Sequence, residues 1–337
     1  MTSPSSALPV ARFTTPAEIA AAIPVLTGFV PRESVVVLSL RPPRKRIGLT
    51  MRFDLPPDDL AHVLAAEVAA RLEHDGAMTA VVAVYTESPD LNGRRAGQAL
   101  VDAIEDVHPV SEALLVRDGR WWSYLCSGAS CCPSEGTPLE DAASPALELL
   151  ATESTLKGRA VLASREELVA SIAPPQLLAA VVAEQRLDAA AESFVTALAE
   201  PRAATEAALA SARRLLEAGC DEPVGPAAAA DFAMALHLKA VRDEIATWGL
   251  DRAEDLLGLL IQVARQVVPP YDAPICTLLA WISYAEGNGA LANVALDRAL
   301  DTDPDYTMAG LLRQALDTQM APADVRRLLR STRDALT

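Results

Sequence analysis

The sequence predicts an α/β fold in the N-terminal half, with a mostly parallel sheet and one hairpin, followed by an all-α C-terminal half. Three observations support this fold class. Continuous Val-rich runs at 34–40 and 79–85 are typical of strands that are buried on both faces. Segments with helical spacing separate the strands, and this alternation is typical of α/β folds. From about residue 146 onward the spacing is helical nearly throughout.

The first helix and the hairpin follow from local signals. Thr15-Pro16 predicts the start of a short helix, because Thr is a good N-cap and Pro suits the first helical position. Residues 47–55 alternate between apolar and polar side chains, as a half-buried strand does. The basic turn 41–46 joins this strand to the run at 34–40, and we therefore expect a hairpin.

The rest of the sheet is predicted from alternating strand and helix patterns. Helical spacing is found at 57–75 and 92–107, and further strands are expected at 111–117 and 120–125 around the turn Asp118-Gly119. Because a helix between two strands allows both strands to run in the same direction, we expect a largely parallel sheet.

Composition limits the classes of function. The chain has 337 residues, of which 51% are hydrophobic, and a net charge of -16. A core of ordinary size is therefore available, while the charge opposes binding to nucleic acid or to an anionic membrane. No apolar run approaches the roughly 20 residues of a membrane span, and we recognise no secretory signal. We expect a cytoplasmic protein that binds neither nucleic acid nor membrane.

Composition and proline positions also predict how the chain is divided. We expect a flexible tail rich in Ser, Pro and Thr, an α/β domain, a helical linker or arm, and a helical domain. Their predicted bounds are 1–15, 16–150, 151–225 and 226–337.

A helical hairpin is indicated at 274–303. Small residues such as Ala280 and Ala292 allow two antiparallel helices to approach closely, Gly287 allows the chain to turn, and Pro304 ends the second helix. This spacing resembles one tetratricopeptide-type repeat. The alternative is a plain helical hairpin within a bundle. In either case the helical half is a candidate surface for a protein partner.

The most unusual stretch contains a candidate functional cluster of Trp122, Tyr124, Cys126, Cys131 and Cys132. Three interpretations remain open. A zinc site would need four ligands, and too few are near in the sequence, so we expect no bound metal. A redox-active or nucleophilic thiol would need a nearby cation or helix N-terminus. Otherwise the cysteines are small buried groups that hold an irregular loop beneath the aromatic rings, and we favour this interpretation.

Arg52 and Asp54 are candidate ligand anchors. They flank Phe53 in a predicted strand, so their side chains lie on the same face of the sheet. If Phe53 faces the core, the pair faces solvent or a cleft at the end of the strand, where ligands bind in α/β folds. The alternative, which we favour, is an exposed ion pair that contributes little to stability.

Four short motifs and the C-terminal stretch 287–306 carry a resemblance to a known family. The motifs are Gly28-Phe29-Val30-Pro31, Arg52-Phe53-Asp54-Leu55-Pro56, Trp122-Ser123-Tyr124 and Cys131-Cys132-Pro133. Together they resemble an uncharacterised family that is widespread in actinobacteria and is known only as a domain of unknown function. The resemblance covers nearly the whole chain and implies a cytoplasmic actinobacterial protein. It implies no activity, substrate or catalytic residue.

Common catalytic signatures are absent from the sequence. It contains no phosphate-binding loop, no G-x-S-x-G nucleophile elbow and no H-E-x-x-H helix, and Gly93 and Gly97 fall inside a predicted helix. The sequence identifies no cofactor. Two classes of function remain. The first, which we favour, is an interaction or regulatory protein that holds a partner with its helical half. The second is a small-molecule-binding, redox-sensitive or catalytic protein with a site near the cysteine loop.

Overall fold

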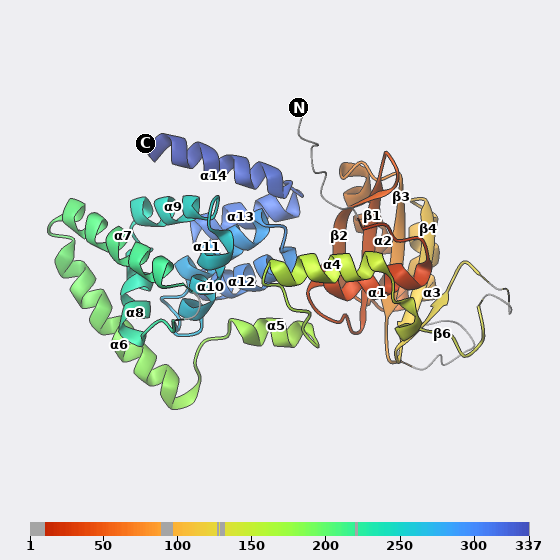
Figure 1. Cartoon of the computed structure of the whole chain (residues 1–337), viewed down its shortest axis with the longest axis horizontal. Helices are drawn as coiled ribbons and strands as arrows, with labels where there is room; N and C mark the ends of the chain where they lie inside the picture. The colour runs from red at the N-terminus through yellow and green to blue at the C-terminus, as the bar shows by residue number, and fades with distance from the viewer. Residues whose placement is uncertain (1–10, 89–96, 127, 129–131, 220–221, 337) are drawn as a thin grey trace, which may run out of the picture. The chain divides into compact units, whose positions relative to one another are not determined.

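The structure is a computed structural model, and it describes residues 11–88, 97–126, 128, 132–219 and 222–336. The chain divides into two compact units, Met1–Arg165 and Glu166–Thr337, which can be followed from red to blue in Figure 1. We call the first the sheet unit and the second the helical unit.

The sheet unit contains the strands and the main helices of the predicted α/β domain. Short 3-10 turns lie at Asp58–Leu60 and Glu140–Ala142. The other elements are α1 (Pro16–Thr27), β1 (Ser34–Arg41), β2 (Arg46–Asp54), α2 (Ala61–His74), β3 (Thr79–Tyr85), α3 (Gln98–Glu105), β4 (Val110–Arg117), β5 (Arg120–Ser123), β6 (Thr137–Pro138) and α4 (Pro145–Leu156).

The strands form one six-stranded sheet in the order β2-β1-β3-β4-β5-β6. Within the described residues only β3 and β4 are parallel neighbours, and the other neighbouring strands are antiparallel. The prediction of a mostly parallel sheet is therefore wrong. The reason is the position of β1. Strands β2 and β3 run in the same direction and are connected through α2, but β1 lies between them and pairs with both in the opposite direction.

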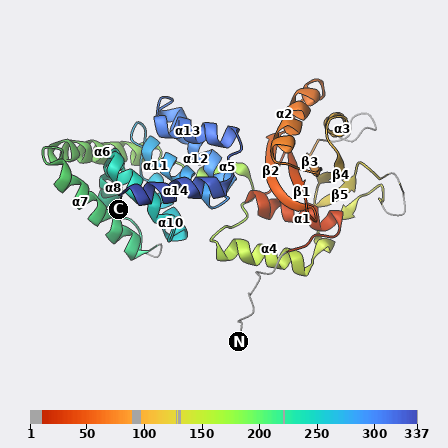
Figure 2. The same ribbon diagram turned by 90° about the horizontal axis from the view of Figure 1, so that it is seen from above.

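Helices cover both faces of the sheet, as Figure 2 shows for α2 and α3 on one side and α1 on the other. Because side chains alternate along a strand, Val35 and Val37 of β1 pack with α2 and α3. Val36 and Leu38 face the opposite side, where Ile23 of α1 lies. Val, Leu and Ile side chains therefore fill both layers beside the middle of β1, and the prediction that this run is an interior strand is confirmed.

Other local predictions are also confirmed. The side-chain hydroxyl of Thr15 caps α1 by accepting a hydrogen bond from the Glu18 amide at 3.2 Å. Strands β1 and β2 form the expected hairpin, and β4 and β5 lie on either side of the turn Asp118-Gly119.

The third helix differs from its prediction over 92–107. Residues 89–96 lie outside the described residues, so the first part of that prediction, with Gly93, concerns a segment that is not described. Gly97 is not inside the helix, because α3 begins at Gln98 and Gly97 is its N-cap. Its φ of 76° is left-handed, a conformation that glycine adopts without strain. A Cβ atom there would lie 2.9 Å from a methyl group of Val84.

The helical unit consists of consecutive helices. Within the predicted helical linker or arm over 151–225 lie α6 and α7, and α6 packs against α8. The bounds are α5 (Arg165–Ser171), α6 (Leu177–Ala197), α7 (Pro201–Ala218), α8 (Pro226–Ala235), α9 (Lys239–Trp248), α10 (Ala253–Ala264), α11 (Ala273–Ala285), α12 (Gly289–Thr302), α13 (Thr307–Asp317) and α14 (Pro322–Leu336).

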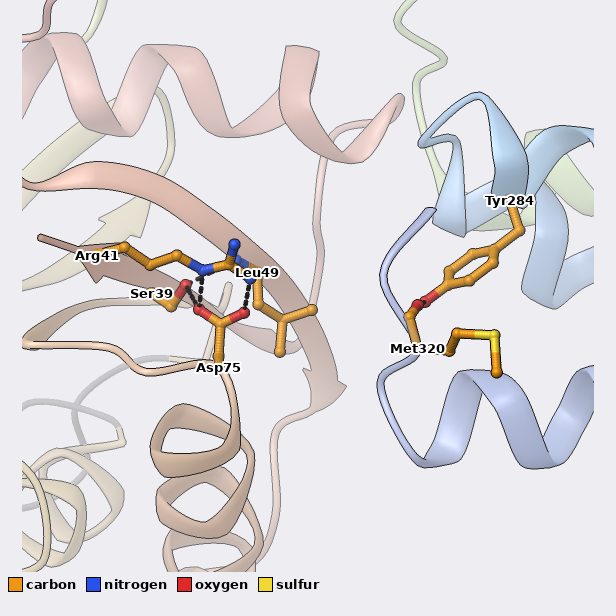
Figure 3. Close-up of polar contacts among 6 residues, drawn as sticks. All are labelled: Ser39, Arg41, Leu49, Asp75, Tyr284 and Met320. Atoms are coloured by element: carbon orange, nitrogen blue, oxygen red, sulfur yellow. Dashed lines mark hydrogen bonds and ion pairs between the residues drawn. The ribbon is translucent and has the colours of Figure 1, made fainter. Parts of the chain in front are cut away.

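The hairpin of α11 and α12 confirms the helix pair predicted over 274–303, with a left-handed Gly287 between the helices. Ala292 is fully buried, as a close helix contact requires. The hydroxyl of Tyr284 donates to the carbonyl of Met320 at 2.6 Å and so ties α11 to the start of α14 (Figure 3). The likeness to a tetratricopeptide-type repeat stays a prediction. Across the described part of the chain, no helix is long and apolar enough to cross a membrane.

Candidate functional site

Polar side chains gather at one edge of the sheet, where β3 and β4 end and β1 begins. Because β3 and β4 are parallel, their last residues, Tyr85 and Arg117, lie at the same edge. Ser34 pairs with both Tyr85 and Asp54, which brings the end of β2 to this edge as well. Ligands of α/β proteins bind outside the carboxyl ends of strands. We call this the carboxyl edge, and it comprises Glu33, Arg52, Asp54, Thr86, Glu87 and Asp118.

Glu33 connects three strands at the carboxyl edge. Its carboxylate accepts hydrogen bonds from the Thr86 hydroxyl at 2.9 Å and from the Glu87 amide at 2.7 Å. Its carbonyl accepts a hydrogen bond from the Leu55 amide at 3.0 Å. The backbone of Glu33 has a φ of 39°, a left-handed value that residues other than glycine rarely adopt. Backbone strain of this kind is concentrated at functional sites.

Glu87 and Asp118 form a pair of interacting carboxyl groups. The pKa of Glu87 is raised above its usual value, chiefly by the hydrogen bond between the two carboxyl groups. Burial and repulsion from Asp118 and Glu33 raise it further, whereas the charge of Arg32 lowers it. Asp118 also has a left-handed backbone, with a φ of 49°. A carboxyl group with a raised pKa is a candidate for proton transfer to a bound molecule.

The predicted anchors Arg52 and Asp54 form an ion pair at the end of β2, with 2.5 Å between Nη1 and Oδ1. The Asp54 side chain is 87% exposed and that of Arg52 is 21% exposed. The Nε atom of Arg52 and the hydroxyl of Ser34 are buried without a hydrogen-bond partner in the described residues. An ion pair with so exposed a partner contributes little to stability. The role of the pair as a ligand anchor stays a prediction.

The side chain of Trp122, a residue of β5, is held by the segment that returns toward β6. Its indole Nε1 donates to the Ser134 carbonyl at 3.1 Å, and the guanidinium of Arg117 lies 5.3 Å from its ring centre. Gly136 allows the return segment to pass close to the ring, because a Cβ atom at Gly136 would lie 2.5 Å from it. The φ of Gly136 is 77°, which also favours glycine.

The cysteine part of the predicted cluster is only partly described. Cys131 lies outside the described residues, while Cys126 and Cys132 are partly exposed. The amide of Cys132 donates to the Gly128 carbonyl at 2.8 Å, and the amide of Tyr124 donates to the Ala113 carbonyl at 2.8 Å. In the residues that the structure describes, no three or more His, Cys, Asp and Glu side chains are placed to hold a metal ion. The close packing of all three cysteines under the aromatic rings stays a prediction.

Strand β5 leads away from the carboxyl edge. It is antiparallel to β4, so the chain moves from Arg120 at that edge toward the amino end of β4, where Tyr124 meets Ala113. The chain therefore approaches Cys126 while moving away from the edge where Arg52 and Asp54 lie.

Sequence patterns did not identify Glu33, Glu87 and Asp118. These residues belong to no catalytic motif, and they are distant in the sequence. A usable signal is nevertheless present, because Glu87 and Asp118 each come directly after a buried strand, within two residues of its end. Polar residues at that position are brought together when the two strands are parallel neighbours.

Comparison with known proteins identifies one related group. Residues 16–323 match the family model of a domain of unknown function (DUF4192). No curated protein and no solved structure shows significant similarity to the chain. The matched segment includes strands of the sheet unit and helices of the helical unit, so the family is defined by both.

Proposed function

The chain belongs to the domain-of-unknown-function family DUF4192, and from this premise we propose that it is a cytoplasmic interaction protein that holds a protein partner with its helical unit. The observation that supports this proposal is an exposed apolar patch at the start of α6. The patch consists of Leu177, Leu178 and Val181, whose exposed fractions are 89%, 76% and 47%. We call these three side chains the α6 patch.

The α6 patch differs from single exposed apolar residues, which are common on protein surfaces. Its three members lie within five consecutive positions, and α6 already packs on the helical unit through other residues, including Leu187. Leu177 has a left-handed backbone with a φ of 54°, which is unfavourable for a side chain of this kind. Clustered exposed apolar groups are typical of protein interaction sites.

The free energy gained by burying the α6 patch is sufficient for a specific contact. Burial of an exposed Leu side chain contributes about 1.5–3 kcal/mol, so the two leucines of the α6 patch would contribute several kcal/mol to binding. A partner with an apolar groove would bury both side chains at once.

The proposal is tested by affinity purification of the full chain from its own cytoplasm, with wild type, a Leu177→Ser/Leu178→Ser variant and a Val195→Ser control. Val195 is 66% exposed on the same helix, outside the α6 patch. We expect a partner that is retained by wild type and control and lost with the double variant. Equal retention of all proteins by the three baits would refute the proposal.

A second candidate function rests on the cluster of Glu33, Glu87 and Asp118 at the carboxyl edge, where the pKa of Glu87 is raised chiefly by its hydrogen bond with Asp118. Perturbed carboxyl groups at the ends of parallel strands are typical of sites that bind or transform small molecules. We expect native mass spectrometry of the purified protein to show a bound small molecule that is lost in Glu87→Gln. Retention of the same adduct by Glu87→Gln, or a wild-type mass without any adduct, would exclude this function.

A further inference from the structure

A small cavity in the helical unit lies between α6 and α8. Its volume is about 140 Å³, and its apolar walls include Ala183, Leu187 and Pro226. Arg186 and Arg265 also line it, and both residues are exposed. A cavity of about this size can hold a molecule as large as a benzene ring, so there is room for a small ion with its bound water.

The two arginines differ from most others in the unit. Most arginines of the helical unit are in ion pairs, but within the described residues neither Arg186 nor Arg265 has a carboxylate within 4.0 Å. Asp188, two positions after Arg186, accepts a hydrogen bond from the Tyr271 hydroxyl at 2.6 Å instead. In a chain of net charge -16, two arginines without an ion pair therefore line the same cavity.

The wall of the cavity opposite α6 is held in place by hydrogen bonds. The side chains of Gln262 and Gln266 bond the amide and the carbonyl of Val224 at 2.9 and 3.0 Å. Val224 precedes α8, so these bonds fix the start of that helix. The first turn of α8 has no side-chain cap, and its positive end adds to the charge of the arginines. These bonds hold the wall at the start of α8 in place, whereas Arg186 and Arg265 are exposed residues that a bound anion would order.

We propose that this cavity binds an oxyanion group, a carboxylate or a phosphate, between Arg186 and Arg265. Guanidinium groups bind both kinds of oxyanion through paired charge-assisted hydrogen bonds. The volume fits a small anion or the anionic end of a larger molecule. The lining includes none of the three residues of the α6 patch, and the inference goes beyond the proposed function.

The test is isothermal titration calorimetry of the full chain at constant ionic strength, with inorganic phosphate and with succinate as probes. The variants are Arg186→Gln and Arg265→Gln, and the control is Arg214→Gln, an exposed arginine of α7 that does not line the cavity. Loss of one hydrogen bond to a charged group costs about 1.5–3 kcal/mol, so each variant should bind about 10- to 100-fold more weakly. The control should bind like wild type.

The two probes distinguish the sources of the oxyanion. Binding of phosphate alone assigns a phosphate ligand, and binding of succinate alone assigns a carboxylate ligand. No binding of either probe at millimolar concentration, or equal binding by wild type and both variants, would overturn the proposal. Circular dichroism of each variant checks that the fold is retained. The Leu177→Ser/Leu178→Ser protein should bind the probes normally, so failure of the partner proposal is separable from failure of this one.

Discussion

The polar cluster that joins β1 to the end of α2 provides the sharpest test of the sheet unit. Figure 3 shows Asp75, the residue after α2, with its carboxylate between Ser39 and Arg41. The carboxylate accepts hydrogen bonds from the Ser39 hydroxyl at 2.5 Å and from the Arg41 Nε at 2.8 Å, with an ion pair to Arg41 in addition. The hydroxyl of Ser39 also accepts a hydrogen bond from the Leu49 amide of β2 at 2.6 Å. One carboxylate therefore fixes the hairpin to α2.

The cost of Asp75→Asn can be derived from these contacts. The Asp75 side chain is 4% exposed, whereas that of Arg41 is 47% exposed. Loss of a hydrogen bond to a charged group costs about 1.5–3 kcal/mol. The exposed ion pair adds less than about 1 kcal/mol. We expect Asp75→Asn to destabilise the sheet unit by about 2–3 kcal/mol. Because each 1.4 kcal/mol changes an equilibrium constant tenfold, the equilibrium constant for opening of the sheet unit should rise roughly 30- to 140-fold.

Hydrogen exchange read by mass spectrometry measures this effect in each unit separately. Amides of β1 and β3 should exchange faster in Asp75→Asn, while those of α11 and α12 should be unchanged. Glu73→Gln is the matched control, because Glu73 is an exposed carboxylate of the same helix. Wild-type exchange of β1 in Asp75→Asn would show that the cluster does not hold the sheet unit together, and the reasoning above would be refuted.

The difference in stability between wild type and Asp75→Asn should depend on pH. Burial raises the pKa of Asp75, but hydrogen bonds from Arg41 and Ser39 lower it by more, so the net pKa lies below its usual value. A carboxyl group with a lowered folded pKa contributes stability above its unfolded pKa of about 3.9. That contribution is lost as the pH falls through the folded pKa. The difference between wild type and Asp75→Asn should therefore be constant near neutral pH and decrease below about pH 4.

Three further outcomes are expected. Ala292→Leu should overpack the α11–α12 hairpin by about 1–3 kcal/mol, and an unchanged melting temperature would contradict the close contact at Ala292. Gly136→Ala should destabilise the loop by a similar amount, because its Cβ would meet the Trp122 ring; wild-type tryptophan fluorescence through a denaturant titration would argue against this. Burial raises the pKa of the Cys276 thiol to about 12, and only the thiolate reacts, so mass spectrometry should find Cys126 alkylated before Cys276 in the native protein. Earlier labelling of Cys276 would contradict the burial.

Local patterns predicted the elements well, because they depend on neighbours in the sequence. The run at 34–40 is rich in apolar residues and is an interior strand. Thr15 begins α1 and Gly287 follows α11, and both positions depend only on local signals. The order of strands was not predictable in this way. A strand-helix-strand pattern fixes the direction of β2 relative to β3, but it does not say whether β1 lies between them.

The candidate sites show the same limit. Arg52 and Asp54 were predicted as a pair because two residues that alternate with Phe53 share a face, and they do form an ion pair. The contact of Glu33 with Thr86 and Glu87 joins residues more than fifty positions apart, and it depends on the pairing of β1 with β3. Arg186 and Arg265 are still further apart, and no spacing rule connects them. Their shared cavity is a product of helix packing alone.

The chemistry of the two units supports different roles for them. The cavity of the helical unit is lined by Pro, Ala, Leu, Gln and Arg side chains. None of these is a nucleophile or a general base at neutral pH, so the role proposed for the cavity is recognition of an anion. The carboxyl edge of the sheet unit has a different character, because the carboxyl groups of Glu33, Glu87 and Asp118 gather there. The anion-binding proposal therefore concerns the helical unit alone, and the small-molecule proposal concerns the sheet unit.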